Sequence, residues 1–188
     1  LVIAATAFLC LLFLLKNLPV LPSKSAGSLK SLPLIFKRKA LVSLYLLTAT
    51  LVTAHFIAYT YIEPYLLQIS NFSAGLATLA LLIYGLAGIV GSIIYSKTNE
   101  AGFCRNIFAP VLGIIIALFL LQYSPFYLYP LFLMAFWGIC IMLFSLNGHE
   151  RVIRFGADST DIAMSLFSGI FNIGIGAGAL IGGLFVTQ

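Results

Sequence analysis

Residues 74–96 read AGLATLALLIYGLAGIVGSIIYS, an apolar run that contains no Asp, Glu, Lys, Arg or His. A helix rises about 1.5 Å per residue, so a run of this length can cross the roughly 30 Å hydrocarbon core of a bilayer. A strand in lipid would need a closed barrel and a period-two pattern, which this run lacks. The stretch therefore predicts a transmembrane α-helix.

The composition extends this prediction to the whole chain. Hydrophobic residues make up 62% and charged residues 8% of the 188 residues, and the mean hydropathy is +1.12. Soluble domains carry about 25% charged residues, and a soluble domain of this length buries only about 70% of its surface. We therefore expect an all-α membrane protein. Further spans are expected near 40–62, 106–122, 127–148 and 162–187, after a shorter apolar run at Leu1–Leu15.

The basic residues all fall in alternate connections between these spans. Connections 16–39, 97–105 and 149–161 hold all ten Lys and Arg residues, and connections 63–73 and 123–126 hold none. Alternating spans then place every basic residue, including Lys24 and Arg154, on one side of the membrane, which the positive-inside rule assigns to the cytoplasm. The net charge of +5 is explained by this orientation, and nucleic acid is not an expected partner.

The connection 16–39 is the longest, and it is rich in Pro, Ser and Gly. This composition is typical of a linker on the membrane surface. It is interpreted either as a join between two helical bundles or as an ordinary long loop.

The 40–62 span carries polar side chains along one helical face. On a 3.6-residue period, Tyr45, Thr48, His55, Tyr59 and Glu63 share a stripe. Polar groups are costly in lipid, so the stripe is expected to face protein or a watery cavity. Tyr and Thr offer neutral hydrogen bonds and aromatic faces, which suit a sugar.

His55 and Glu63 are the candidates for proton coupling or solute binding in this stripe. An intramembrane histidine can titrate near neutral pH, and it is a functional hypothesis by default. The alternatives are that His55 is a hydrogen-bonded interhelical residue and that Glu63 marks the water interface. Pro64 is expected to end the helix directly after Glu63.

Three further polar side chains lie in the later spans and are candidates for the solute path. Trp137 is in mid-span rather than in an interfacial belt, so its indole N–H needs an acceptor. Asn172 is the one amide in the apolar run 162–187 and needs a protein or solute partner. Asn147 is the amide near the end of the 127–148 span. For Trp137, plain packing is an equal alternative.

Glycines form close-approach faces on two spans. Gly-x-x-x-Gly spacing lets another helix backbone come near. We expect these faces to meet a partner bundle and slide during transport, with static packing as the alternative. The glycines are Gly85, Gly88 and Gly91 in one span, and Gly174, Gly178 and Gly182 in the other.

Signatures of catalysis and of cofactor binding are missing from the sequence. It contains no H-E-x-x-H motif, no Walker loop and no G-x-G-x-x-G after a strand. Cys10, Cys104 and Cys140 are scattered, without a C-x-x-C pair, and they predict neither a disulfide framework nor a zinc site. We therefore expect no enzyme activity, no metal and no cofactor.

Three segments resemble bacterial sugar efflux transporters of the major facilitator superfamily, of the arabinose and glycoside efflux type. They are Val52-Thr53-Ala54-His55, Tyr61-Ile62-Glu63-Pro64 and the run LFSGIFNIGIGAGAL at 166–180. The resemblance implies twelve helices in two six-helix bundles. Residues 1–15 would be the end of helix six, 16–39 the central cytoplasmic loop, and 40–188 the C-terminal bundle with helices seven to eleven and without helix twelve. The chain is then expected to be a C-terminal portion, with the N-terminal bundle of the same polypeptide as its partner.

The resemblance also implies a function. Such proteins are secondary active transporters of the bacterial inner membrane that export sugars by proton antiport with alternating access, so a small sugar, protons and membrane lipid are the expected partners. Two alternatives stay open. One is a drug or amphiphile exporter of the same superfamily, with a pocket lined by some of the sixteen Phe and nine Tyr residues. The other is a membrane scaffold without transport activity.

Overall fold

The computed structural model describes residues 2–17, 32–98, 102–123 and 127–186, and all regular structure in this part of the chain is helical. The prediction of an all-α chain is confirmed for these residues. The elements in order are α1 (Val2–Asn17), α2 (Leu32–Lys37), α3 (Lys39–Tyr59), α4 (Ile62–Gln68), α5 (Ala74–Ser96), α6 (Phe103–Leu121), α7 (Tyr129–Phe155), the 3-10 turn η3 (Ala157–Ser159) and α8 (Thr160–Val186).

Among the described residues, four helical segments are long and apolar enough to cross a membrane. They are Lys39–Gln68, Ala74–Ser96, Tyr129–Phe155 and Ala157–Phe185, and they correspond to four of the expected spans. The fifth, expected near 106–122, is a shorter apolar helix at Arg105–Leu121. The largest change in a boundary is at α7, which continues to Phe155 instead of ending near 148. The expected connection 149–161 is therefore mostly helix.

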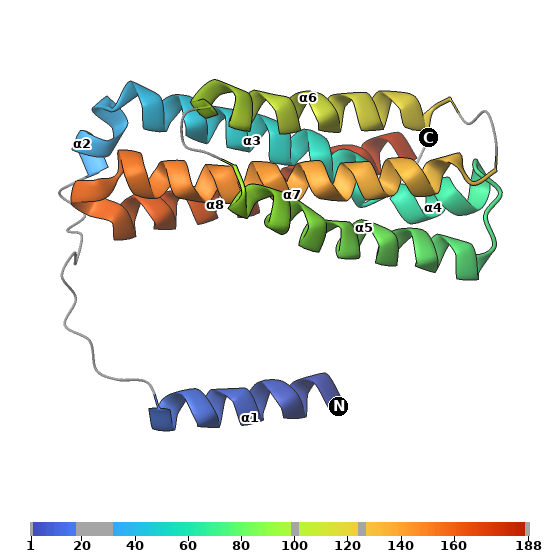
Figure 1. Ribbon diagram of the computed structural model, residues 1–188, viewed down its shortest axis with the longest axis horizontal. Helices are drawn as coiled ribbons and strands as arrows, with labels where there is room; N and C mark the ends of the chain where they lie inside the picture. Colours follow the sequence, from blue (N-terminus) through green and yellow to red (C-terminus); the bar gives the residue numbers. More distant parts are fainter. Residues whose placement is uncertain (1, 18–31, 99–101, 124–126, 187–188) are drawn as a thin grey trace.

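The long helices from α3 onward reverse direction one after another and lie side by side as one bundle (Figure 1). Within it, α7 packs against α5, α6 and α8, and α3 packs mainly against α8. One apolar core surrounds Trp137 and Phe144, and a second one surrounds Leu41, Val152 and Phe167. Outward-facing Leu, Ile and Phe side chains remain exposed, as is expected of helices that lie in a membrane.

Parts of the segment 16–39, which was expected to be a linker, are helical. Lys16 belongs to α1, whose side chains from Ala4 onward are exposed, and residues 18–31, with Lys24, lie outside the described residues. Residues 32–37 form α2, which packs on α3 and buries Ile35 in the second core. This apolar contact explains why the end of the expected loop is helical.

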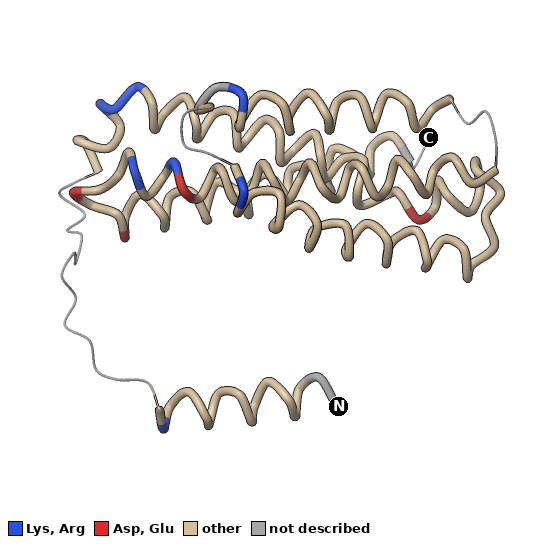
Figure 2. The backbone as a smooth tube through the Cα atoms, viewed as in Figure 1, with Lys and Arg blue, Asp and Glu red and all other residues tan. Residues whose placement is uncertain are grey.

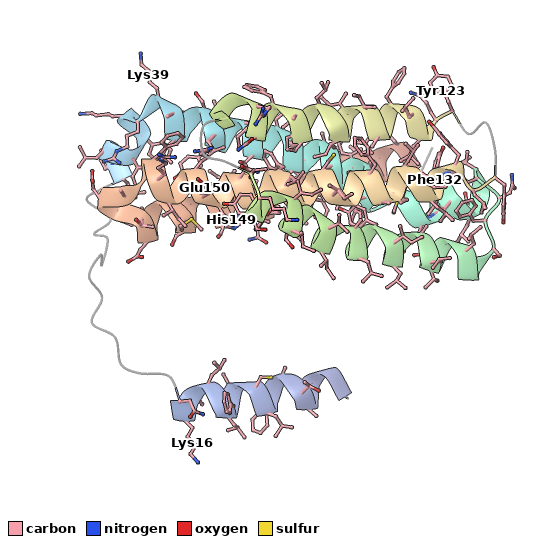
Figure 3. All side chains as sticks on the ribbon, viewed as in Figure 1. Lys16, Lys39, Tyr123, Phe132, His149 and Glu150 are labelled. Atoms are coloured by element: carbon pink, nitrogen blue, oxygen red, sulfur yellow. The ribbon has the colours of Figure 1, made fainter. Side chains whose placement is uncertain are left out.

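The basic residues of the bundle gather at one end, which we name the basic end. Lys37, Arg38 and Lys39 lie at the start of α3, Lys97 follows α5, Arg105 begins α6, and Arg151 and Arg154 are in the last turns of α7 (Figure 2). Lys39 extends away from the bundle there (Figure 3). The starts of α3 and α6 lie at the same end of the bundle as the ends of α5 and α7 (Figure 1). The basic residues of alternate connections are therefore close together in space.

Polar contacts tie the helices together at the basic end. Arg38 pairs with Asp158 and donates a 2.6 Å hydrogen bond to the carbonyl oxygen of Phe155, which links the start of α3 to the α7–α8 turn. On the other side, the Tyr95 hydroxyl of α5 donates to Glu150 of α7 at 2.9 Å. Glu150 also lies 3.7 Å from the buried guanidinium of Arg151. These contacts tie the start of α3 and the end of α5 to the end of α7 and to the α7–α8 turn.

The glycine faces pack inside this bundle, so the expectation that they meet a partner bundle is wrong for five of the six glycines. A Cβ added at Gly178 of α8 would lie 2.6 Å from the Thr53 carbonyl oxygen and 2.7 Å from the Cβ of Phe56, both on α3. The backbones of α3 and α8 approach closely because no side chain separates them. Gly174 and Gly182 also face α3, Gly88 and Gly91 face α7, and only Gly85 of the six opens onto free space.

This packing predicts opposite effects for two alanine substitutions on α8. Gly178→Ala must push α3 away, and we expect it to lower the stability of the bundle by about 1–3 kcal/mol. Gly176→Ala enters open space and improves helix propensity, so it should be neutral or slightly stabilising. Thermal unfolding of both variants in detergent checks the prediction. Equal unfolding temperatures for the two would contradict the assignment of this face to α3.

Candidate functional site

The polar stripe of α3 faces the interior of the bundle down to His55. Tyr45, Thr48, Val52 and His55 are all buried, and His55 is only 3% exposed. They share one face because they follow the helical period, and α7 and α8 cover that face. The prediction that the stripe faces protein is confirmed for these residues.

His55 is held by hydrogen bonds from two other helices. The indole Nε1 of Trp137, on α7, donates to His55 Nδ1 at 3.1 Å, and Trp137 is fully buried. An indole N–H can only donate, so Nδ1 must present its lone pair and the hydrogen of the neutral imidazole is on Nε2. Nε2 lies 3.3 Å from the hydroxyl oxygen of Tyr84, on α5, which accepts this hydrogen. Trp137 thus has the acceptor that the sequence required.

Aromatic rings surround the imidazole. Tyr59 stacks on His55 with ring centroids 5.5 Å apart at 14°, and Trp137 meets the same ring edge-on at 5.1 Å. Tyr84 lies 5.0 Å from Tyr59 and 5.3 Å from Trp137. We name His55, Tyr59, Tyr84 and Trp137 the His55 cluster. Its inner layer, His55 and Trp137, is buried, whereas Tyr59 and Tyr84 are half-buried and form its outer layer.

Tyr84 is the member of the cluster that sequence reasoning missed. The sequence does contain a signal for Tyr84, because this tyrosine lies in the middle of a span rather than near a membrane interface. The same signal singled out Trp137.

Glu63 is not part of the His55 cluster, contrary to its expected place on the stripe. Helix α3 ends at Tyr59, and Glu63 lies exposed in the first turn of α4, at the end of the bundle opposite to the basic end (Figure 2). Pro64 does not end a helix but lies in that first turn, where its missing N–H is tolerated. Since Pro64 cannot donate to the carbonyl of Thr60, the helix breaks one turn before the proline, and the stripe ends with it.

Thr48 and Asn147 are buried but are bonded within their own helices. The Thr48 hydroxyl donates to the Leu44 carbonyl at 2.8 Å, and the Asn147 amide donates to the Leu143 carbonyl at 2.7 Å. The buried Oδ1 of Asn147 has no hydrogen-bond partner among the described residues. Asn147 is ten residues beyond Trp137, roughly 15 Å along α7, so the structure does not bring it to the His55 cluster.

Asn172 lies in a different place. Its side chain is exposed on α8, donates to the Ser168 carbonyl at 2.8 Å and borders a cavity between α7 and α8. His149 borders the same cavity, and sequence reasoning missed it because it placed residue 149 in a connection. Figure 3 shows His149 and Glu150 on α7, toward its basic end.

The geometry of the His55 cluster makes proton binding and the Trp137 contact mutually exclusive. The free lone pair of a neutral imidazole is on the nitrogen without hydrogen, which here is Nδ1. A proton added at Nδ1 would face the indole N–H, and two donors cannot share a hydrogen bond. A proton at His55 Nδ1 would therefore displace either the indole of Trp137 or the imidazole from this contact.

No protein-family model matches the chain.

The Trp137–His55 contact predicts a spectroscopic change on substitution, because Trp137 is the single tryptophan of the sequence. In His55→Leu the indole N–H loses its acceptor, so its fluorescence should move to shorter wavelength. The unpaired buried N–H should also lower stability by about 1–3 kcal/mol. The emission spectrum of the purified chain in detergent tests this. His149→Leu, which removes the other histidine, should leave the spectrum unchanged, and an equal shift in both variants would contradict the contact.

Proposed function

We propose that this chain is part of a secondary active transporter of the major facilitator type, which exports arabinose-like sugars or small glycosides from the cytoplasm by proton antiport. The observation that carries the proposal is the His55 cluster, in which one titratable side chain is buried between spans and hydrogen-bonded to α5 and α7. Ionisable groups inside membrane spans are costly, and they commonly mark ion and substrate paths.

His55 Nδ1 can hold either a proton or the hydrogen bond from the Trp137 indole, and this competition supplies the coupling step. In the neutral state Trp137 occupies Nδ1 and the rings of the cluster stay packed. When a proton arrives at Nδ1 from the outer side, the indole moves away, and the contacts of Tyr59 and Tyr84 with it change. Release of the proton to the cytoplasm restores the bond. Solute affinity thereby alternates with the protonation of His55, so that protons move inward while the solute moves outward.

The outer layer of the cluster suits a neutral, hydroxylated solute. The rings of Tyr59 and Tyr84 pack together with centroids 5.0 Å apart and offer two phenol hydroxyls and aromatic carbon, and no Lys, Arg, Asp or Glu belongs to the cluster. Sugar hydroxyls need such donors and acceptors, and the apolar face of a sugar ring packs on an aromatic ring. A charged solute would find no compensating charge here.

Orientation and partners follow from the charge distribution and the resemblance. The basic end faces the cytoplasm by the positive-inside rule, and the bacterial inner membrane is the proposed location. A second bundle of the same polypeptide completes the transport path and closes the cluster from the side on which Tyr59 and Tyr84 are half-buried.

Amphiphile export is a second candidate, and one cavity favours it. A space of about 260 Å³ between α3, α4 and α6 is lined mainly by apolar and tyrosine side chains, among them Ile57, Ala58, Tyr61, Ile62 and Leu118. Pockets of this kind bind apolar ligands.

The test measures transport by the full-length protein in proteoliposomes. With a proton gradient, the wild type should drive uphill transport of labelled arabinose. His55→Gln keeps a hydrogen-bonding side chain but cannot be protonated, so proton-driven accumulation should be lost while arabinose exchange without a gradient persists. Glu63→Gln should retain proton-driven accumulation, because Glu63 lies outside the cluster.

Three results would contradict the proposal. If His55→Gln accumulates arabinose as the wild type does, His55 is not the coupling group. If a hydrophobic cation is transported and arabinose is not, the protein is an amphiphile exporter. If neither solute moves, the protein is a membrane component without transport activity.

A further inference from the structure

We infer that the cavity between α7 and α8 is a binding site for a small neutral polyol, separate from the His55 cluster. Its volume is about 200 Å³, and its lining consists of Ser145, His149, Phe167, Ser168, Phe171 and Asn172. The inference extends the proposed export function by adding a second sugar site to the path, but the observations that support it are independent of proton coupling.

The polar groups of this cavity are arranged as two matched pairs on facing helices. On α7, His149 Nδ1 lies 2.7 Å from the Ser145 carbonyl oxygen, one turn earlier. On α8, Asn172 Nδ2 donates to the Ser168 carbonyl at 2.8 Å, also one turn earlier. Each bond fixes a long polar side chain against its own helix and directs its remaining polar atom away from the backbone.

These bonds decide which atoms are left for a ligand. A carbonyl oxygen only accepts, so His149 Nδ1 carries the hydrogen and Nε2 of the neutral ring is an acceptor. The Oδ1 atom of Asn172 is a second acceptor, and each serine hydroxyl can both donate and accept. None of these four groups has a hydrogen-bond partner elsewhere in the described part of the chain. By contrast, Ser165, one turn before Ser168, donates its hydroxyl to the Asp161 carbonyl at 2.7 Å.

Two phenylalanine rings complete the site. Phe167 is fully buried and meets the His149 ring edge-on, with centroids 4.9 Å apart at 78°. Phe171 is half-buried, and its ring lies 6.2 Å from that of Phe167. These rings offer an apolar wall next to the hydroxyl, amide and imidazole groups, which is the combination that recognises a sugar ring.

The lining also restricts the class of ligand. No Lys, Arg, Asp or Glu lines the cavity, which is open where Ser168 and Asn172 are exposed, so a charged solute would find no compensating charge in its wall. One histidine without a carboxylate or thiolate does not form a metal site. The volume is below the roughly 300–1,000 Å³ of sites for drug-sized ligands, and four of the six lining residues are polar, which favours a small hydroxylated ligand over a large amphiphile.

The two histidines of the sequence allow a direct test, because each belongs to a different site. The chain is labelled with ¹⁵N-histidine, purified in detergent and titrated with arabinose while the imidazole resonances are recorded. His55→Gln and His149→Gln, which each remove the two imidazole signals of one residue, provide the assignment. We expect arabinose to shift the His149 Nε2 resonance, since a sugar hydroxyl donates to that atom.

Variants of the lining then show whether the response comes from this cavity. Ser145→Ala combined with Ser168→Ala should weaken the apparent affinity by about tenfold or more, because two hydrogen bonds to the sugar are lost. Ser165→Ala, on the same helix but bonded to its own backbone, should keep the wild-type affinity. An unchanged His55 resonance shows that each variant is folded.

The results of these experiments test the binding site independently of the proposed export function. The inference is overturned if saturating arabinose leaves the His149 resonance unmoved, if only His55 responds, or if the double serine variant binds as the wild type does. It is also overturned if a hydrophobic amphiphile shifts His149 and arabinose does not. A response of His149 in a protein that moves no arabinose across proteoliposomes would refute export and support this binding site.

Discussion

Close backbone contact at glycine residues is the constraint on which the rest of this bundle depends. A Cβ at Gly138 of α7 would overlap the carbonyl oxygen of Tyr84 on α5, and one at Gly178 of α8 would overlap the carbonyl oxygen of Thr53 on α3. Gly138 is adjacent to Trp137, and Thr53 is two residues from His55. In lipid the hydrophobic effect does not drive helices together, so packing of small residues does. The same contacts that hold the helices together therefore position the members of the His55 cluster.

The sequence predicted the spans well, because hydrocarbon imposes one strong rule on length and polarity. It also predicted that Trp137 needs an acceptor, since a buried polar group without a hydrogen bond is costly, and it offered a hydrogen-bonded interhelical role as one of two interpretations of His55. It could not say that they are each other's partners, because residues 82 positions apart are brought together only by tertiary packing. For the same reason the glycine spacing predicted a close approach but not the helix that approaches, and the partner bundle was the wrong choice.

The errors at Glu63 and His149 have a common physical cause, which is that the end of a hydrophobic run is not the end of a helix. Backbone hydrogen bonds continue α7 through His149, Glu150 and Arg151, where Tyr95 and buried packing stabilise charged side chains. At α3 the helix ends although the apolar run continues, because Pro64 lacks a backbone N–H and the helix breaks before it. The periodicity that placed Glu63 on the stripe assumed an unbroken helix.

The two histidines show how one side chain supports different chemistry in one bundle. His55 accepts at Nδ1 from an indole, so its lone pair is occupied and its environment must rearrange before a proton can bind. His149 donates from Nδ1 to a backbone carbonyl, so its Nε2 lone pair is left for a hydroxyl donor in the adjoining cavity. The hydrogen-bond partner of Nδ1 thus decides the tautomer in both cases. A buried, occupied acceptor suits the coupling of proton binding to movement, whereas an open acceptor beside serine, asparagine and phenylalanine suits the binding of a neutral solute without movement.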